Sequence, residues 1–233
     1  MYRLYPRANE PGNQHEPDGM DPDDFNSMQL AWGRLLERYR VAAAEAMPVF
    51  RVLAQAYQSV GRYYHTLEHL EEMLRVAGRL MAITDDPRAL QLAIWFHDAV
   101  YDPRGTDNEA RSADLAVSLL GPIGVPRSDL DIVARLIHAT AHIAYPQPPV
   151  DRETAILLDA DLAILGSPPE RYDRYAADIR KEYAWVPEND YRKARAKVLE
   201  HFLGRPRLFW SDSLHADCDG LARRNLQREL ATM

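Results

Sequence analysis

The chain has 233 residues, of which 46% are hydrophobic and 27% charged, and its formal net charge is −7. This composition is typical of a soluble globular protein. The acidic balance argues against a nucleic acid partner, since no strongly basic surface is available to neutralise a phosphate backbone. One cysteine, Cys218, excludes a disulfide framework and favours a cytoplasmic protein. No stretch approaches the roughly 18 apolar residues that cross a bilayer, so no membrane partner is expected.

The first 22 residues are expected to form a flexible leader, and residues 23–233 one helical domain. The leader is rich in proline and glycine, and its charged residues leave no apolar segment of the kind found in signal peptides.

Helical periodicity continues through almost all of the remaining chain. Between Thr66 and Met81, for example, apolar residues recur with a period of 3.6. No alternating strand pattern of convincing length is present. The sequence predicts an all-α fold, a single compact bundle of about eight to ten helices joined by short loops. The expected helices span about residues 21–41, 48–59, 66–81, 85–99, 107–120, 128–143, 151–165, 168–185, 187–203 and 215–230.

Two short segments carry candidate metal ligands. His65 and His69 are four residues apart, so a helix would place both on one face. His97 and Asp98 follow the apolar stretch 90–96. Each segment is also compatible with an ordinary structural role, because a histidine pair with this spacing is often a surface feature and an aspartate often caps a helix.

A third segment places two acids, Asp159 and Asp161, in a strongly apolar predicted helix. Either acid could cap a helix or pair with an arginine. Burying an ionised carboxylate without a partner is costly, and a shared divalent metal would compensate Asp98 and these acids together. Imidazole and carboxylate ligands suit Mn, Fe, Co, Ni or Zn better than Ca; Mg is a further candidate, and the sequence does not identify the metal.

Taken in this order, the segments resemble the HD superfamily of metal-dependent phosphohydrolases. In that family a histidine, a His-Asp dipeptide and a distant aspartate lie on helices around one metal. The resemblance implies that His69, His97, Asp98 and Asp161 are metal ligands and that the helical domain is of the HD type. A bacterial group of predicted HD phosphohydrolases is similar over most of the chain after residue 25, through Tyr64-His65, Phe96-His97-Asp98-Ala99-Val100-Tyr101, Asn108-Glu109, Asp159-Ala160-Asp161-Leu162-Ala163-Ile164-Leu165-Gly166 and Arg180-Lys181-Glu182-Tyr183.

The segment 65–69 also resembles the His-Asn-x-x-His element of cyclic nucleotide phosphodiesterases, with Thr66 in place of the asparagine. In those enzymes the first histidine donates a proton and the second binds the metal. The resemblance therefore implies that His65 is the catalytic acid and His69 a ligand. Asp98 would bind metal and also help to position the attacking water. The Asp-Leu pair at 161–162 resembles a Cys-Asp-Leu element of the same enzymes, which favours Asp161 over its neighbour at 159.

Three further residues are candidates for substrate binding. His142 follows His138 by four residues on a predicted helix, and the pair either lines the site or lies on the helix surface. Arg180 and Arg195 lie on later helices, and a guanidinium group suits phosphate. The alternative for both arginines is an ordinary solvated surface.

The sequence thus predicts an enzyme, a metal-dependent phosphohydrolase that cleaves a small phosphorylated substrate, a nucleotide or a small phosphoester, with a metal-activated water. The alternative is a metal-stabilised module that binds or senses a nucleotide without turnover. A purely structural helical protein would leave the acids in apolar segments unexplained. The sequence does not predict an oligomeric state.

Overall fold

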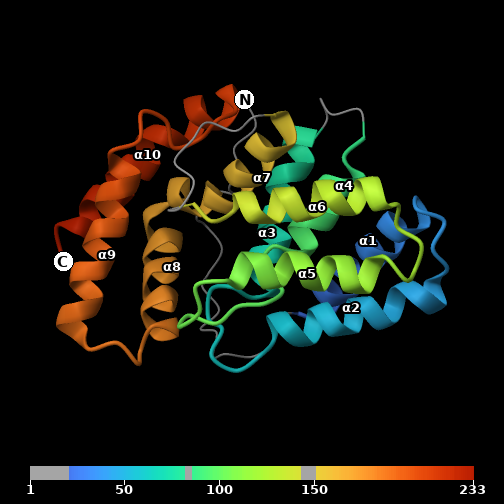
Figure 1. Cartoon of the computed structure of the whole chain (residues 1–233). Coiled ribbons are helices and arrows are strands. Elements are labelled where there is room, and N and C mark those ends of the chain that lie inside the picture. Colours follow the sequence, from blue (N-terminus) through green and yellow to red (C-terminus); the bar gives the residue numbers. More distant parts are fainter. Residues whose placement is uncertain (1–20, 82–85, 143–150) are drawn as a thin grey trace.

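The computed structural model describes residues 21–81, 86–142 and 151–233, and within these segments the chain is helical and contains no strand (Figure 1). The prediction of an all-α bundle of about eight to ten helices is confirmed. Most of the predicted leader lies outside the described residues. The described helices are α1 (Pro22–Glu37), α2 (Ala43–Tyr57), α3 (Leu67–Leu80), α4 (Arg88–Phe96), α5 (Asn108–Leu120), α6 (Arg127–Ala139), α7 (Arg152–Leu162), α8 (Pro169–Glu182), α9 (Glu188–Leu203) and α10 (Asp212–Leu230), with a short 3₁₀ helix, η2 (Ala163–Gly166), after α7.

Aspartate caps begin two of the helices where the sequence indicates. The Asp21 carboxylate accepts a hydrogen bond from the backbone N–H of Asp23 at 2.8 Å, and Pro22 occupies the first helical position of α1. The Asp151 carboxylate accepts from the N–H of Thr154 at 2.8 Å at the start of α7. These caps satisfy backbone donors that have no partner within the helix.

Several predicted boundaries differ from the structure by a few residues, and α2 and α7 show the physical reasons. Helix α2 begins at Ala43 rather than at Pro48, which lies inside the helix. A proline there removes one backbone donor, and burial of Ala46, Val49 and Phe50 on the surrounding turns favours the helix. Helix α7 ends at Leu162 and continues as the tighter η2, so the predicted helix 151–165 is two elements.

Helix α4 lies at the centre of the bundle and packs against α3, α5, α6 and α7. All of its residues except Arg88 and Gln91 are buried. Trp95 makes an edge-to-face contact with Trp32 of α1, with ring centroids 5.3 Å apart. One hydrophobic core includes side chains from every described helix. The central, largely buried position of α4 fixes the residues that directly follow it.

Helices α8, α9 and α10 form one side of the molecule, the left side of Figure 1. A buried ion pair joins two of them, with Nε of Arg195 on α9 2.8 Å from Oε1 of Glu229 on α10. The hydroxyl of Tyr172 on α8 donates to the same carboxylate at 2.5 Å. Each member of this network is hydrogen-bonded, as buried charges require.

The segment after α7 is held against α10 by a close backbone approach. A Cβ added at Gly166 would lie 2.7 Å from Cβ of Cys218, so only glycine allows this contact. The side-chain amide of Asn225 on α10 donates to the carbonyls of Leu165 and Ser167, each at 2.9 Å. These contacts fix the end of η2 against α10.

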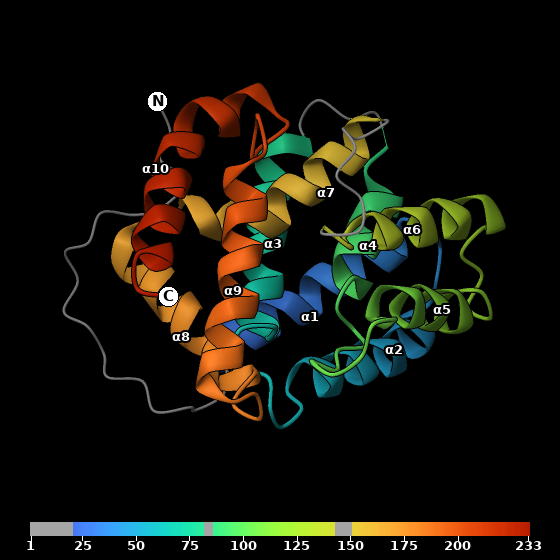
Figure 2. The ribbon, with the colours of Figure 1, turned by 60° about the vertical axis from the view of Figure 1, so that its left-hand side comes forward.

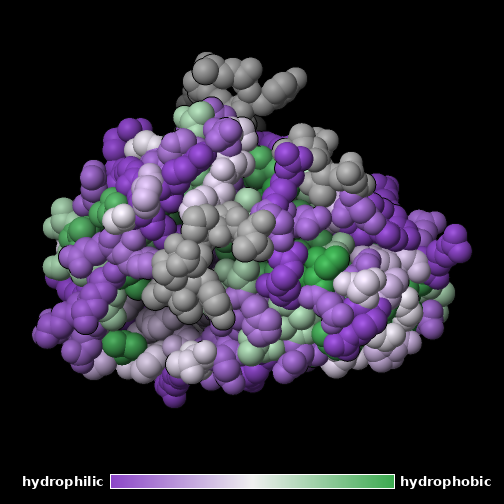
Figure 3. All heavy atoms as spheres, turned by 45° about the horizontal axis from the view of Figure 1, so that its top comes forward, coloured by the Kyte–Doolittle hydropathy of each residue, from purple (hydrophilic) through white to green (hydrophobic). Residues whose placement is uncertain are grey.

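The described helices include none with the length and apolar character needed to cross a bilayer. The face drawn in Figure 3 is largely hydrophilic, and its apolar side chains lie in small scattered groups.

Candidate metal centre

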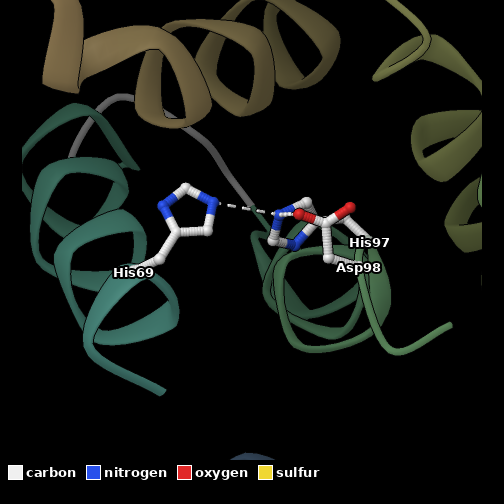
Figure 4. A group of neighbouring side chains, drawn as sticks. All are labelled: His69, His97 and Asp98. Carbon is white, nitrogen blue, oxygen red and sulfur yellow. Dashed lines mark hydrogen bonds and ion pairs between the residues drawn. The ribbon is translucent and has the colours of Figure 1, made fainter. Parts of the chain in front are cut away.

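Three elements bring the candidate ligands together. Helix α3 contacts α7 and α4, and α4 contacts α7 (Figure 2). His69 lies in the first turns of α3, on the face that also buries Leu70 and Met73. His97 caps the end of α4, and Asp98 follows it. Figure 4 shows His69 directed from α3 towards His97 and Asp98.

The distances between the ligand atoms fit a single bound ion. Candidate atoms of His69, His97 and Asp98 all lie within 4.8 Å of one another. The two Nε2 atoms of the histidines are 3.3 Å apart, and His97 Nε2 is 3.0 Å from Asp98 Oδ2. Ligands about 2.1 Å from one ion are separated by about 3.0 Å in octahedral and about 3.4 Å in tetrahedral geometry. The donor set therefore fits a divalent metal.

Asp161 lies beside these three residues but is not one of the residues whose ligand atoms all lie within 4.8 Å of one another. Its Oδ1 is 3.3 Å from Nε2 of His69 and 3.9 Å from Nε2 of His97. Its Oδ2 is 2.7 Å from Nε2 of His142. The structure thus places all four predicted ligands around one point, and it adds His142 as a hydrogen-bonding partner of Asp161.

Backbone contacts orient the His-Asp segment. Nδ1 of His97 lies 2.8 Å from the carbonyl oxygen of Ile94, and donation there directs Nε2 towards the cluster. The guanidinium of Arg62 donates to the carbonyls of Asp98 at 2.7 Å and of Ala99 at 3.1 Å. A cation is favourable at this end of α4, where carbonyl groups lack helical partners. Arg62 was not singled out from the sequence.

The charges of the cluster shift the pKa values of its members. Burial lowers the pKa of His97, but the charge of Asp98 and its hydrogen bond outweigh burial and raise this pKa to about 9. Burial raises the pKa of Asp98, but the charge of His97 outweighs it and holds the value below the usual range. For Asp161, hydrogen bonds from His142 and His69 likewise outweigh burial and lower the pKa. The acids are ionised at neutral pH, as metal ligation requires.

His65 does not lie on the helix as the spacing predicted. Helix α3 begins at Leu67 with Thr66 as its cap, so His65 precedes the helix, and the assumed shared helical face is wrong. The His65 ring nevertheless reaches the cluster, with Nε2 3.9 Å from Oδ2 of Asp98. Its ring stacks on Tyr101, with centroids 4.1 Å apart.

Glu182 fixes the position of His65, a role that no sequence pattern indicated. One carboxylate oxygen accepts from the backbone N–H groups of Tyr63, Tyr64 and His65 at 2.8, 2.8 and 3.1 Å. The other lies 2.7 Å from Nδ1 of His65 and accepts from the hydroxyl of Tyr101 at 2.8 Å. Burial lowers the pKa of His65, but the hydrogen bond and charge of Glu182 outweigh it, so the pKa rises above its ordinary value.

Other predicted residues lie elsewhere in the described structure. Asp159 is buried and accepts from the backbone N–H groups of Trp210 and Ser211 at the start of α10, so it is a structural acid. Arg180 donates to the carbonyls of Tyr183 and Val186 and to Glu188. Arg195 is buried against Glu229, as described above. Both arginines thus have partners away from the cluster, and their role in substrate binding stays a prediction. His138 is exposed on α6.

The cluster is buried on one side and accessible on the other. The side chains of His69 and His97 are 2% and 1% exposed, whereas Asp98 is 18% and Asp161 15% exposed. His65 is also 18% exposed. The imidazoles of His69 and His97 therefore come from the core, and the two carboxylates and His65 are partly exposed.

Comparisons with known proteins identify no relative, since no family model, no curated protein and no solved structure matches the chain.

Proposed function

We propose that the protein is a metal-dependent phosphohydrolase of the HD superfamily and cleaves a phosphate ester of a small molecule. The observation that carries the proposal is the position of His65. This imidazole is held by Glu182 at 2.7 Å and directs Nε2 towards Asp98, at 3.9 Å, without belonging to the ligand cluster. A candidate proton donor therefore lies beside a candidate metal centre, which is the pair of groups that hydrolysis of a phosphate ester needs.

His69, His97, Asp98 and Asp161 would hold the ion. A divalent ion bound by these side chains would lower the pKa of a water molecule towards neutrality and polarise a phosphoryl oxygen. Ile94 and Arg62 keep the His-Asp segment in place through their backbone contacts. Asp98 is partly exposed and lies between the ligands and His65, where its carboxylate can orient the attacking water.

His65 acts on the leaving group. Donation from Nδ1–H to Glu182 leaves Nε2 facing the centre, and the raised pKa keeps a proton on Nε2 over a larger part of the neutral pH range. The proton passes from Nε2 to the ester oxygen as the bond to phosphorus breaks, and the imidazole is then reprotonated from water. Glu182 is a positioning residue for this step, since it contacts the imidazole and not the centre.

The test is phosphate release from nitrophenyl phosphate, bis-nitrophenyl phosphate and a panel of nucleotides, with Mn, Fe, Co, Ni, Zn or Mg added. Activity should require a metal and should be lost in His69→Ala. The matched control is His138→Ala, which removes an exposed histidine on α6 and should keep wild-type activity. A protein that binds metal and nucleotide but releases no phosphate from any substrate would instead be a binding or sensing module.

A further inference from the structure

Arg205 has no acidic partner in the described structure. It lies two residues after the end of α9. Its Nη2 donates to the backbone carbonyl of His142 and lies 3.2 Å from Nε2 of His201. Its guanidinium carbon is 4.6 Å from the ring centroid of Phe202. None of these contacts brings a negative charge to Arg205.

Two other arginines with little exposed side-chain area are paired with carboxylates, whereas Arg62, like Arg205, donates to carbonyl groups. Arg171 donates to Glu72 and Arg195 to Glu229, each with a shortest distance of 2.8 Å. For Arg205, no carboxylate of the described residues is within 4.0 Å. The segment 143–150, which directly follows His142 in the chain, contains neither aspartate nor glutamate. Neither the described structure nor this neighbouring segment supplies a negative charge.

The guanidinium also keeps unused hydrogen-bond donors. Its Nε is buried and makes no hydrogen bond within the described part of the chain. Burial lowers the pKa of Arg205, and no neighbouring acid opposes that effect. A buried donor without a partner and a partly desolvated cation are both unfavourable. A bound anion with oxygen acceptors would relieve both, since phosphate oxygens pair well with guanidinium groups.

His142 connects Arg205 to the candidate metal centre. Its backbone carbonyl accepts from Arg205, and Nε2 of its imidazole lies 2.7 Å from Oδ2 of Asp161. Asp161 Oδ1 in turn lies 3.3 Å from His69. His142 is thus the residue through which Arg205 is linked to the predicted ligands.

We propose that Arg205 binds a second anionic group of the substrate, a phosphoryl group other than the one hydrolysed at the metal centre. The inference rests on the proposed function, because it assumes that the bound molecule is a substrate. It specifies the substrate class as a small molecule with two phosphoryl groups, such as a nucleoside diphosphate or a sugar bisphosphate. His142 positions Arg205 through its carbonyl. Arg205 is then a specificity residue that favours such substrates over monophosphates.

The test measures binding of inorganic phosphate to the full chain by calorimetry, in chelator, so that no metal contributes to affinity. Wild-type protein should bind phosphate, and Arg205→Met should bind at least about tenfold more weakly, as expected for loss of a charged hydrogen-bond donor. Arg192→Met is the matched control, because Arg192 is an exposed arginine of α9 that pairs with Glu188; its affinity for phosphate should equal that of the wild type.

Two results would overturn the inference: no phosphate binding by wild-type protein, or equal binding by wild type and Arg205→Met. If Arg205→Met does not fold, Arg205→Lys decides, since lysine keeps the charge and loses the planar fork; it should bind phosphate more weakly than the wild type. No hydrolysis enters this experiment. If phosphate binding depends on Arg205 but the protein hydrolyses no substrate, only the proposed function is contradicted. If the protein hydrolyses phosphate esters but its phosphate binding does not depend on Arg205, only the inference is contradicted.

Discussion

Replacement of Glu182 by glutamine tests how strongly the structure depends on a charge at this position. Five hydrogen-bond donors converge on the carboxylate, from three backbone N–H groups, His65 and Tyr101. Burial raises the pKa of Glu182, but the hydrogen bond and charge of His65 outweigh it and lower the pKa from 4.5 to about 2. A glutamine side chain has one acceptor oxygen, and its NH₂ group would face hydrogen-bond donors where the carboxylate has its second oxygen.

The size of the effect follows from that pKa. Each pKa unit corresponds to about 1.4 kcal/mol, so a shift from 4.5 to about 2 corresponds to about 3 kcal/mol of stability at neutral pH. Because the pKa is lower in the folded than in the unfolded protein, this contribution is complete above about pH 5. It is lost as the pH falls through 4.5 towards 2. Glu182→Gln should therefore unfold about 6–12 °C below the wild type at pH 7.

The assay is thermal or urea unfolding in chelator at a series of pH values between 7 and 3, since chelator removes any contribution of metal. The stability difference between wild type and Glu182→Gln should shrink as the pH falls below about 4.5. Glu200→Gln, which changes an exposed glutamate of α9, is the control and should have little effect. A difference that is as large at pH 3 as at pH 7 would refute the electrostatic origin of the effect.

Three further predictions concern the metal centre. In metal at about a hundred times its Kd, wild-type protein should gain about 2.7 kcal/mol of stability. Asp161→Asn should gain much less stability from the metal than the wild type does. If the variant were less stable than the wild type by the same amount in chelator as in metal, Asp161 would be a purely structural acid. Because the metal must displace the proton that His97 holds with a pKa of about 9, apparent metal affinity should rise about tenfold per pH unit from pH 6 towards 9 in a chelator-dye competition; pH-independent affinity would contradict this. His65→Ala should lower the rate by roughly a hundredfold or more on esters with poor leaving groups. The defect should be smaller on nitrophenyl esters, and an equal defect on both would remove the acid role.

The helices were predictable because their signals are local. Apolar residues at helical spacing and caps such as Asp151 act within one or two turns of the chain. The predicted start of α2 at residue 48 is wrong, because burial of the residues around Pro48 maintains the helix on both sides of the proline. Helix packing then brings α3, α4 and α7 together, and no local pattern specifies that arrangement.

The candidate site was predictable only in part. Asp98 and Asp161 stand out because an acid in an apolar segment is costly to bury unless it has a partner, but Asp159 carries the same signal and is a structural acid. The family resemblance, and not a local pattern, implies His69 and His97 as further ligands and favours Asp161 over Asp159. Glu182 lies in the segment 180–183, which carries part of the resemblance but indicates no role for the glutamate, and Arg205 belongs to no pattern that the sequence singles out. Their relevance follows from contacts in the folded structure: Glu182 contacts His65, and Arg205 contacts His142.

The most direct test of the metal centre is the metal content of the purified chain. Protein reconstituted separately with Mn, Fe, Co, Ni and Zn and then desalted should carry about one or two ions per chain of at least one of these metals. His69→Ala should lose the ion, whereas His65→Ala, which removes an imidazole outside the cluster, should keep it. Less than about a tenth of an ion per chain with every metal, or metal retained in His69→Ala and lost in His65→Ala, would contradict the assignment of this centre.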